Sequence, residues 1–178
     1  MRDILKTFGN LEEDISLKDY NTYKINSYAK YLIRPYSIED LIKLLKCLKE
    51  NDLKYFILGN GSNVILSDNK FDGVIIKLDY LNEVKIKDLE VYVEAGVMIN
   101  SFSLEMINNN LKGLEWATGI PGTIGGSLVG NAGAYNACIF DFIKEVTFLD
   151  EFLNVKILSK NEIDYGYRYT MFKNSKNI

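Results

Sequence analysis

Six of the 13 glycines of this chain fall within one short stretch, TGIPGTIGGSLVGNAGAY at residues 118–135. One of the two prolines, Pro121, lies there as well and is expected to fix a turn. Glycine costs about 0.5–1 kcal/mol relative to alanine inside a helix or strand, so such a cluster is expected where the backbone must turn sharply or approach a ligand closely. Residues 123–128 are predicted to begin a short helix whose unpaired N–H groups face a phosphate. The structural alternative is a glycine-rich segment that only packs closely.

A second glycine-bearing loop, GNGSN at residues 59–63, lies between a strand predicted at 54–58 and the apolar run 64–66. Small residues in such a turn allow several main-chain N–H groups to converge on an anion, and a serine and an asparagine add side-chain donors. The spacing matches neither GxxxxGK[ST] nor GxGxxG, so neither a P-loop nor a Rossmann site is indicated. Taken alone, the loop is better explained as a structural turn. The two loops together favour a large ligand with two phosphates, such as a dinucleotide, held between them.

Composition excludes several classes of function. The net charge of −3, the pI of about 5.1 and the presence of only three arginines argue against binding to nucleic acid. Histidine is absent, which removes Ser–His and Cys–His nucleophile pairs and the commonest metal ligand, and no metal site is expected. The separated Cys47 and Cys138 are expected to be small buried thiols in a reducing compartment. No apolar run is long enough to span a membrane and the first residues do not resemble a signal peptide, so a cytoplasmic protein without a membrane partner is expected.

Hydrophobic periodicity predicts an α+β fold. A helix is expected over 37–50, with Ser37 as its N-cap and leucines along one face, and another over 100–110. Further strands are predicted at 73–78 and 90–95, and a hairpin from 145–150 and 155–158. The chain is expected to form two lobes, residues 1–78 and 79–178.

The segment GYRYTMFK at residues 166–173 places Arg168 between two tyrosines. A guanidinium group is a planar fork of donors that suits a carboxylate, a phosphate or a developing enolate. On composition alone, a solvated cation packed on aromatic rings is the alternative.

Five motifs together resemble a known family. They are NTYKI at 21–25, LGNGSNVILSD at 58–68, TGIPGTIGG at 118–126, NAGAY at 131–135 and GYRYTMFK at 166–173. Their order and approximate spacing are similar to those of bacterial UDP-N-acetylenolpyruvoylglucosamine reductase, also called UDP-N-acetylmuramate dehydrogenase, a flavoenzyme of peptidoglycan precursor synthesis. The resemblance spans nearly the whole chain.

The resemblance implies a two-lobed FAD-binding fold of the vanillyl-alcohol-oxidase/PCMH type. It implies that NADPH reduces FAD, and that reduced FAD delivers hydride to the enolpyruvyl double bond of a UDP-sugar substrate. By the same resemblance, the residues that hold FAD are Gly59, Asn60, Gly61, Ser62, Asn63, Thr118, Gly119, Ile120, Pro121, Gly122, Thr123, Gly125, Gly126, Asn131 and Gly133. Arg168 matches the active-site arginine that binds the substrate carboxylate and stabilises an enol-type intermediate, and Tyr167 is expected to shape that site.

The chain also departs from the family pattern. Asn26 and Ser27 stand where relatives usually have glycines, and residues 136–138 lack the glycine that usually follows NAGAY. Relatives continue into a third domain with a proton-donating serine and an assisting glutamate, so this chain alone is expected to bind FAD without completing the reduction. Two alternatives stay open: another FAD-dependent oxidoreductase of the same superfamily, and a non-catalytic flavin- or nucleotide-binding module.

Overall fold

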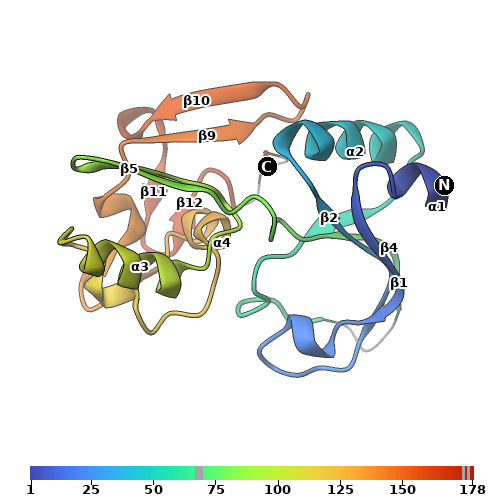
Figure 1. Cartoon of the computed structure of the whole chain (residues 1–178), viewed down its shortest axis with the longest axis horizontal. Helices are drawn as coiled ribbons and strands as arrows, with labels where there is room; N and C mark the ends of the chain where they lie inside the picture. The colour runs from blue at the N-terminus through green and yellow to red at the C-terminus, as the bar shows by residue number, and fades with distance from the viewer. Residues whose placement is uncertain (67–69, 174, 176) are drawn as a thin grey trace. The chain divides into compact units, whose positions relative to one another are not determined.

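A computed structural model describes residues 1–66, 70–173, 175 and 177–178 (Figure 1). The chain divides into two compact units, Met1–Val97 and Met98–Ile178, each with its own internal contacts. The sequence predicted two FAD-binding lobes, residues 1–78 and 79–178. That division concerns how the chain binds FAD, and it stays a prediction.

Unit 1 is built on a mixed four-stranded sheet. Its strands, in their order across the sheet, are β1 (Gly9–Ser16), β2 (Tyr28–Pro35), β4 (Lys70–Ile76) and β3 (Tyr55–Ile57). The β1–β2 pair is antiparallel, whereas β2–β4 and β3–β4 are parallel. The remaining elements of the unit are α1 (Arg2–Leu5), the 3-10 turn η1 (Lys18–Tyr20), α2 (Ile38–Glu50) and the antiparallel hairpin β5 (Val84–Lys87) and β6 (Glu90–Val93).

The helix predicted after Ser37 is confirmed as α2. The Ser37 side chain accepts a hydrogen bond from the Asp40 N–H at 3.1 Å, which satisfies one of the free donors of the first turn. Glu39 and Asp40 place negative charge in that turn, where the helix dipole favours it. The buried face consists of Leu41, Leu44, Leu45 and Leu48.

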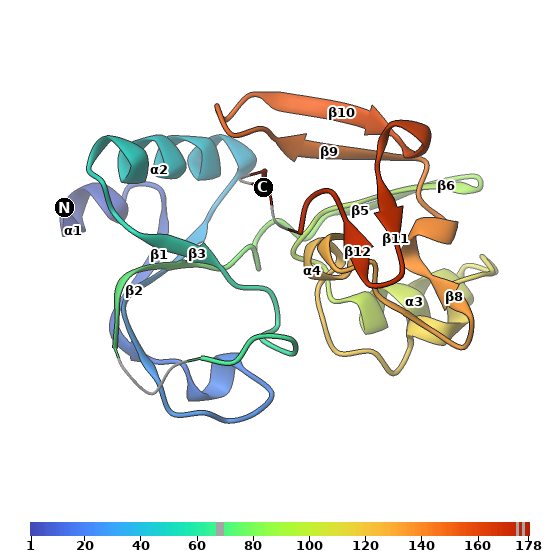
Figure 2. The same ribbon diagram turned by 180° about the vertical axis from the view of Figure 1, so that it is seen from behind.

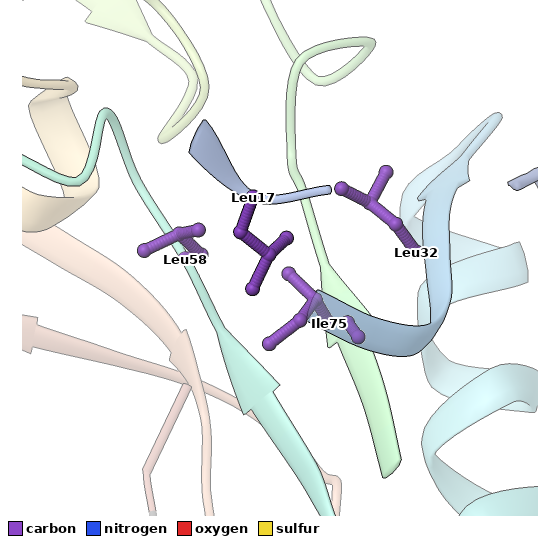
Figure 3. Close-up of a cluster of buried hydrophobic side chains, with 5 residues drawn as sticks. Leu17, Leu32, Leu58 and Ile75 are labelled. Carbon is purple, nitrogen blue, oxygen red and sulfur yellow. The ribbon is translucent and has the colours of Figure 1, made fainter. Parts of the chain in front are cut away.

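The core of unit 1 includes the residue that precedes the GNGSN loop. Figure 3 shows part of it, a cluster formed by Leu17, Ala29, Leu32, Leu58 and Ile75, each at most 2% exposed. These residues come from β2, β4 and the ends of β1 and β3. Leu58 is the residue immediately before Gly59, so the chain enters the loop from a fixed point in the core.

Unit 2 consists of short helices and two-stranded ribbons (Figure 2). Its helical elements are α3 (Ile99–Asn108), α4 (Ile124–Val129) and the 3-10 turns η2 (Glu115–Ala117), η3 (Ile139–Asp141) and η4 (Lys160–Glu162). Its ribbons are β7 (Gly133–Ala134) with β8 (Ala137–Cys138), β9 (Glu145–Leu149) with β10 (Val155–Ser159), and β11 (Tyr165–Gly166) with β12 (Tyr169–Thr170). The predicted second helix and the predicted hairpin are thereby confirmed as α3 and β9–β10.

Several local predictions need correction. Strands β1, β2 and β5 were not predicted from the sequence, and within the described residues the apolar run 64–66 forms no strand. The strands predicted at 73–78 and 90–95 are β4 and β6, whose bounds differ by a few residues. Strand β1 was not predicted because it contains three consecutive acidic residues, and acidic residues are uncommon in strands. They are tolerated here because β1 is an edge strand.

Both cysteines are free thiols, but the prediction that they are buried is wrong: each is half-buried. Cys47 lies at the margin of the leucine face of α2, and Cys138 lies in the short ribbon β7–β8.

Within the part of the chain that the structure describes, no helix is both long and apolar enough to cross a bilayer. Within the same residue ranges, no group of three or more acidic or cysteine side chains is arranged to hold a metal ion.

Replacing Leu32 by alanine tests the core of unit 1. Leu32 is fully buried, so Leu32→Ala should lower the free energy of unfolding by about 2–5 kcal/mol. The control is Leu89→Ala, because Leu89 is 87% exposed and its loss should change stability by about 0.5 kcal/mol or less. Urea denaturation followed by circular dichroism measures both, and equal effects from the two variants would contradict this description of the core.

Candidate functional site

The GNGSN loop leaves strand β3 and is held closely against another segment of unit 1. The Leu58 N–H donates to the Ile76 carbonyl at 2.9 Å, which extends the β3–β4 pairing by one residue. Gly61 adopts a φ of +66°, and a Cβ added there would lie 2.1 Å from the Tyr20 carbonyl oxygen. The Gly61 carbonyl in turn accepts a hydrogen bond from the Thr22 N–H at 3.3 Å. Only glycine allows the loop to lie this close to residues 20–22.

The segment that supports the loop is itself organised by Asn21, the first residue of NTYKI. Asn21 is 2% exposed, and its side-chain amide donates to the carbonyls of Leu17 at 2.7 Å and Ile25 at 3.0 Å. Its side-chain oxygen accepts from the Ile25 N–H at 3.0 Å. These three bonds close the turn between β1 and β2. In the sequence, NTYKI indicated only a resemblance to a family. The structure shows that its asparagine holds the turn between β1 and β2 in place.

A charged cluster lies beside the same turn. Arg34 on β2 donates to the Glu12 carboxylate at 2.5 Å, to the Tyr20 hydroxyl at 2.9 Å and to the Asp79 carboxylate at 3.1 Å. Burial would lower the pKa of Arg34, but the hydrogen bonds to Glu12, Tyr20 and Asp79 outweigh it and raise the pKa above its usual range. The guanidinium group thus links β1 and β2 to Tyr20 and to the segment that follows β4.

In unit 2, the TGIPGTIGG stretch leads into helix α4 as predicted. The Thr123 side chain caps the helix by accepting a hydrogen bond from the Gly126 N–H at 3.2 Å. The Ile99 N–H donates to the Gly122 carbonyl at 3.0 Å, which fixes the approach to the helix. Gly119 is exposed, and a Cβ added there would meet nothing within 4 Å. The main chain around Gly119 therefore faces open space in unit 2.

The NAGAY segment connects the glycine cluster to the arginine motif. Asn131 is 5% exposed and its side-chain amide donates to the Gly166 carbonyl at 2.8 Å, while its side-chain oxygen accepts from the Phe140 N–H at 3.4 Å. The Thr170 hydroxyl donates to the Val129 carbonyl at 2.8 Å, so ribbon β11–β12 is tied to α4 at a second point. Residues about 40 positions apart in sequence are thus held together within unit 2.

Gly133 has a structural explanation of its own. A Cβ added there would lie 2.4 Å from the Ala137 carbonyl oxygen on the opposite strand of ribbon β7–β8. Close packing accounts for this glycine, and its contact with a flavin stays a prediction.

Arg168 lies at the turn between β11 and β12 and is exposed. It has a φ of +57°, its carbonyl accepts a hydrogen bond from the Lys173 side chain at 2.9 Å, and its guanidinium carbon lies 5.5 Å from the centre of the Tyr167 ring. Tyr167 is itself 92% exposed. Among the described residues, no carboxylate forms an ion pair with Arg168. The geometry fits a solvated cation on an aromatic ring, and it also leaves the guanidinium group accessible to an anionic ligand.

The predicted site residues thus fall into two sets, one in each unit. Residues 59–63 belong to unit 1, and residues 118–126, 131, 133, 167 and 168 belong to unit 2. Within unit 2 the structure brings the glycine cluster, Asn131 and the arginine turn together. Ser67 and Asp68, at the end of the motif LGNGSNVILSD, lie outside the described residues.

Gly61→Ala tests the close contact beneath the GNGSN loop. Because of its positive φ and the nearby Tyr20 carbonyl, the variant should lose at least about 2 kcal/mol of stability. Gly119→Ala is the matched control: it adds the same methyl group where nothing lies within 4 Å, so the free energy of unfolding should change by about 0.5 kcal/mol or less. Chemical denaturation compares the two, and a Gly61→Ala variant as stable as the parent would rule out the contact.

Comparison with known proteins extends this description. Residues 29–151 match the protein family described as FAD binding domain. A UDP-N-acetylenolpyruvoylglucosamine reductase of Caldicellulosiruptor saccharolyticus is 40% identical over 166 residues, which cover 93% of this chain and 54% of that protein. One from Francisella tularensis is 40% identical over 173 residues, covering 94% and 59%. The chain spans about half the length of the curated relatives that it matches.

Two solved structures give the same picture of the fold. The crystal structure of UDP-N-acetylenolpyruvylglucosamine reductase from Thermus caldophilus is 27% identical, with a TM-score of 0.75 over 92% of this chain and 57% of that one. Glucooligosaccharide oxidase from Acremonium strictum is 15% identical, with a TM-score of 0.69 over 86% and 35%, and it shows the fold alone. The predicted α+β fold of the vanillyl-alcohol-oxidase/PCMH type is confirmed.

Proposed function

The chain belongs to the FAD binding domain family, and from that premise we propose that it forms the FAD-binding part of a UDP-N-acetylenolpyruvoylglucosamine reductase. The observation that carries the proposal is 40% identity to enzymes of that name over more than nine-tenths of the chain. The geometry supports it, because the two predicted FAD loops and the arginine turn are each held in a defined conformation. Another FAD-dependent oxidoreductase of the same superfamily remains an alternative, as does a non-catalytic flavin-binding module.

The residues present fit FAD. An anionic diphosphate in an acidic protein has to be held mainly by main-chain N–H groups, and glycine loops provide these without side chains in the way. Gly119, where an added Cβ would meet nothing within 4 Å, leaves room for a ligand directly against the backbone. We assign the diphosphate and its neighbouring groups to residues 59–63 and 118–123, and the flavin to Gly125, Gly126, Asn131 and Gly133.

For two of these residues, existing hydrogen bonds support an indirect role. The Gly126 N–H is already bonded to Thr123, and the side chain of Asn131 is already bonded to Gly166 and Phe140. These groups would therefore shape the flavin site by holding α4 and ribbon β11–β12, and other donors would contact the flavin.

Bound FAD would supply the redox chemistry, taking hydride from NADPH and giving it to the enolpyruvyl double bond of the UDP-sugar. Arg168 would bind the substrate carboxylate, where negative charge grows as hydride arrives, and its planar cation suits that role. Tyr167 would hold the guanidinium group in place through its ring. Reduction of this nucleotide-linked sugar belongs to peptidoglycan precursor synthesis, and we place the protein in the cytoplasm.

Flavin binding by this chain is the direct test. Purified protein incubated with FAD and freed of excess ligand should keep a yellow flavin absorbance with about one FAD per chain. The chain contains no histidine, and its two cysteines, Cys47 and Cys138, are not among the predicted FAD-binding residues, so noncovalent binding is expected. After denaturation and filtration, intact FAD should pass into the filtrate.

Two results would contradict the proposal in different ways. Protein that stays colourless after incubation with FAD would remove every flavin-based function. Flavin that stays with the denatured chain would mean a covalent bond and would favour a different oxidoreductase of the superfamily.

Arg168→Ala separates flavin binding from catalysis. Because Arg168 is exposed and assigned to the substrate, the variant should bind FAD within about twofold of the parent affinity, which flavin fluorescence measures. The equivalent change in a full-length reductase should lower kcat by about 10²–10³. Arg168→Lys should recover little of that loss, because a lysine does not reproduce the planar fork. Unchanged turnover in the alanine variant would remove the arginine from the mechanism.

A further inference from the structure

Lys77 is a buried cation directly beneath the GNGSN loop. It follows strand β4 and is 6% exposed. Its ammonium group donates to the Gly59 carbonyl oxygen at 2.7 Å and forms an ion pair with Asp79 at 3.3 Å. The ring centre of Tyr20 lies 6.0 Å from the same nitrogen. Burial of a charge is costly unless it is paired and hydrogen-bonded, so these contacts fix the ammonium group in one place.

We propose that Lys77 is a positioning residue that fixes the GNGSN loop in the conformation that binds the FAD diphosphate. What the loop binds rests on the proposed function above. That Lys77 fixes the loop rests on the Gly59 contact alone.

The planar peptide between Gly59 and Asn60 carries the argument. In a trans peptide the C=O and N–H groups point in nearly opposite directions. Because Lys77 holds the Gly59 carbonyl toward the interior of unit 1, the Asn60 N–H points away from Lys77. Without that bond the peptide can rotate and withdraw its N–H group from an anion. The Leu58 N–H and the Gly61 carbonyl are anchored separately, so Lys77 holds the part of the loop between them.

The charge of Lys77 is already balanced inside the protein. It belongs to a cluster of two cations and two carboxylates, namely Arg34, Lys77, Glu12 and Asp79. Its ammonium group is directed at a carbonyl and a carboxylate of the chain. This favours a role through the loop over a role as a direct phosphate ligand.

The first experiment measures FAD affinity for Lys77→Met. Fluorescence titration should give a dissociation constant at least about tenfold higher than that of the parent chain, since a hydrogen bond from a charged donor is lost. The matched control is Lys30→Met, because Lys30 pairs with Asp72 at 2.9 Å across β2 and β4 without touching the loop. That control should bind FAD within about twofold of the parent. Equal affinities for the parent and Lys77→Met would overturn the proposal.

A double variant separates loop anchoring from charge. Lys77→Met alone leaves the cluster with one excess negative charge, which would also repel a diphosphate. Adding Asp79→Asn restores neutrality without restoring the Gly59 bond. The double variant should stay at least about fivefold weaker than the parent in FAD binding. Recovery of the parent affinity would show that charge alone matters and would overturn the proposal.

Amide hydrogen exchange on ligand-free protein tests the loop without FAD. In Lys77→Met the amides of residues 59–61 should exchange at least about tenfold faster, while those of strand β2 keep their protection relative to the global unfolding limit. If Lys77→Met does not fold, Lys77→Gln, which keeps an N–H donor but loses the charge, should show the same changes to a smaller degree. Unchanged loop exchange would overturn the proposal even if the parent binds FAD. A parent that binds no FAD but loses loop protection on mutation would refute only the assigned ligand.

Discussion

The close contact between the main chain of Gly61 and that of Tyr20 and Asn21 is the constraint on which the organisation of unit 1 depends. No side chain fits at Gly61, because the space is occupied by the Tyr20 carbonyl. The contact requires the turn between β1 and β2 to be rigid, and the buried Asn21 makes it so through three hydrogen bonds to its own segment. It also requires a fixed entry into the loop, which Leu58 provides from the core. The loop is therefore held in one conformation by contacts within unit 1, which would lower the cost of binding a ligand there.

In unit 2, a helix cap and a buried asparagine side chain fix the second glycine loop and the arginine turn. Its second loop ends in a helix capped by Thr123, and Asn131 joins the segment after that helix to the arginine turn. These contacts hold Arg168 at a defined position relative to the glycine cluster while leaving its guanidinium group exposed. The second glycine loop and Arg168 thus belong to one folded unit, which fixes their relative position.

The sequence predicts those features that depend on neighbouring residues. Ser37 and the leucines of α2 form a local signal, and so do the two glycine loops and the capped start of α4. Strand β1 was not predictable because its acidic residues are tolerated only at a sheet edge, and edge position is a property of the whole fold.

The parts of the site that the sequence missed depend on contacts between distant residues. Lys77 and Gly59 are 18 positions apart, and their bond follows from the parallel pairing of β3 with β4. The sequence did contain one indication of this contact: Lys77 directly follows the buried run Val74–Ile76. A charged side chain at the end of a buried strand needs a partner. For Gly133, sequence reasoning favoured the ligand, whereas cross-strand packing already explains the glycine.

The central proposal is that this chain binds FAD through main-chain N–H groups of its two glycine loops. A crystal structure of the chain in complex with FAD tests it most directly. The account predicts diphosphate oxygens within about 3 Å of main-chain N–H groups in both 59–63 and 118–123, with the Gly59 carbonyl still bonded to Lys77. A complex in which FAD contacts neither loop, or in which the diphosphate is held by side chains elsewhere on the chain, would contradict it.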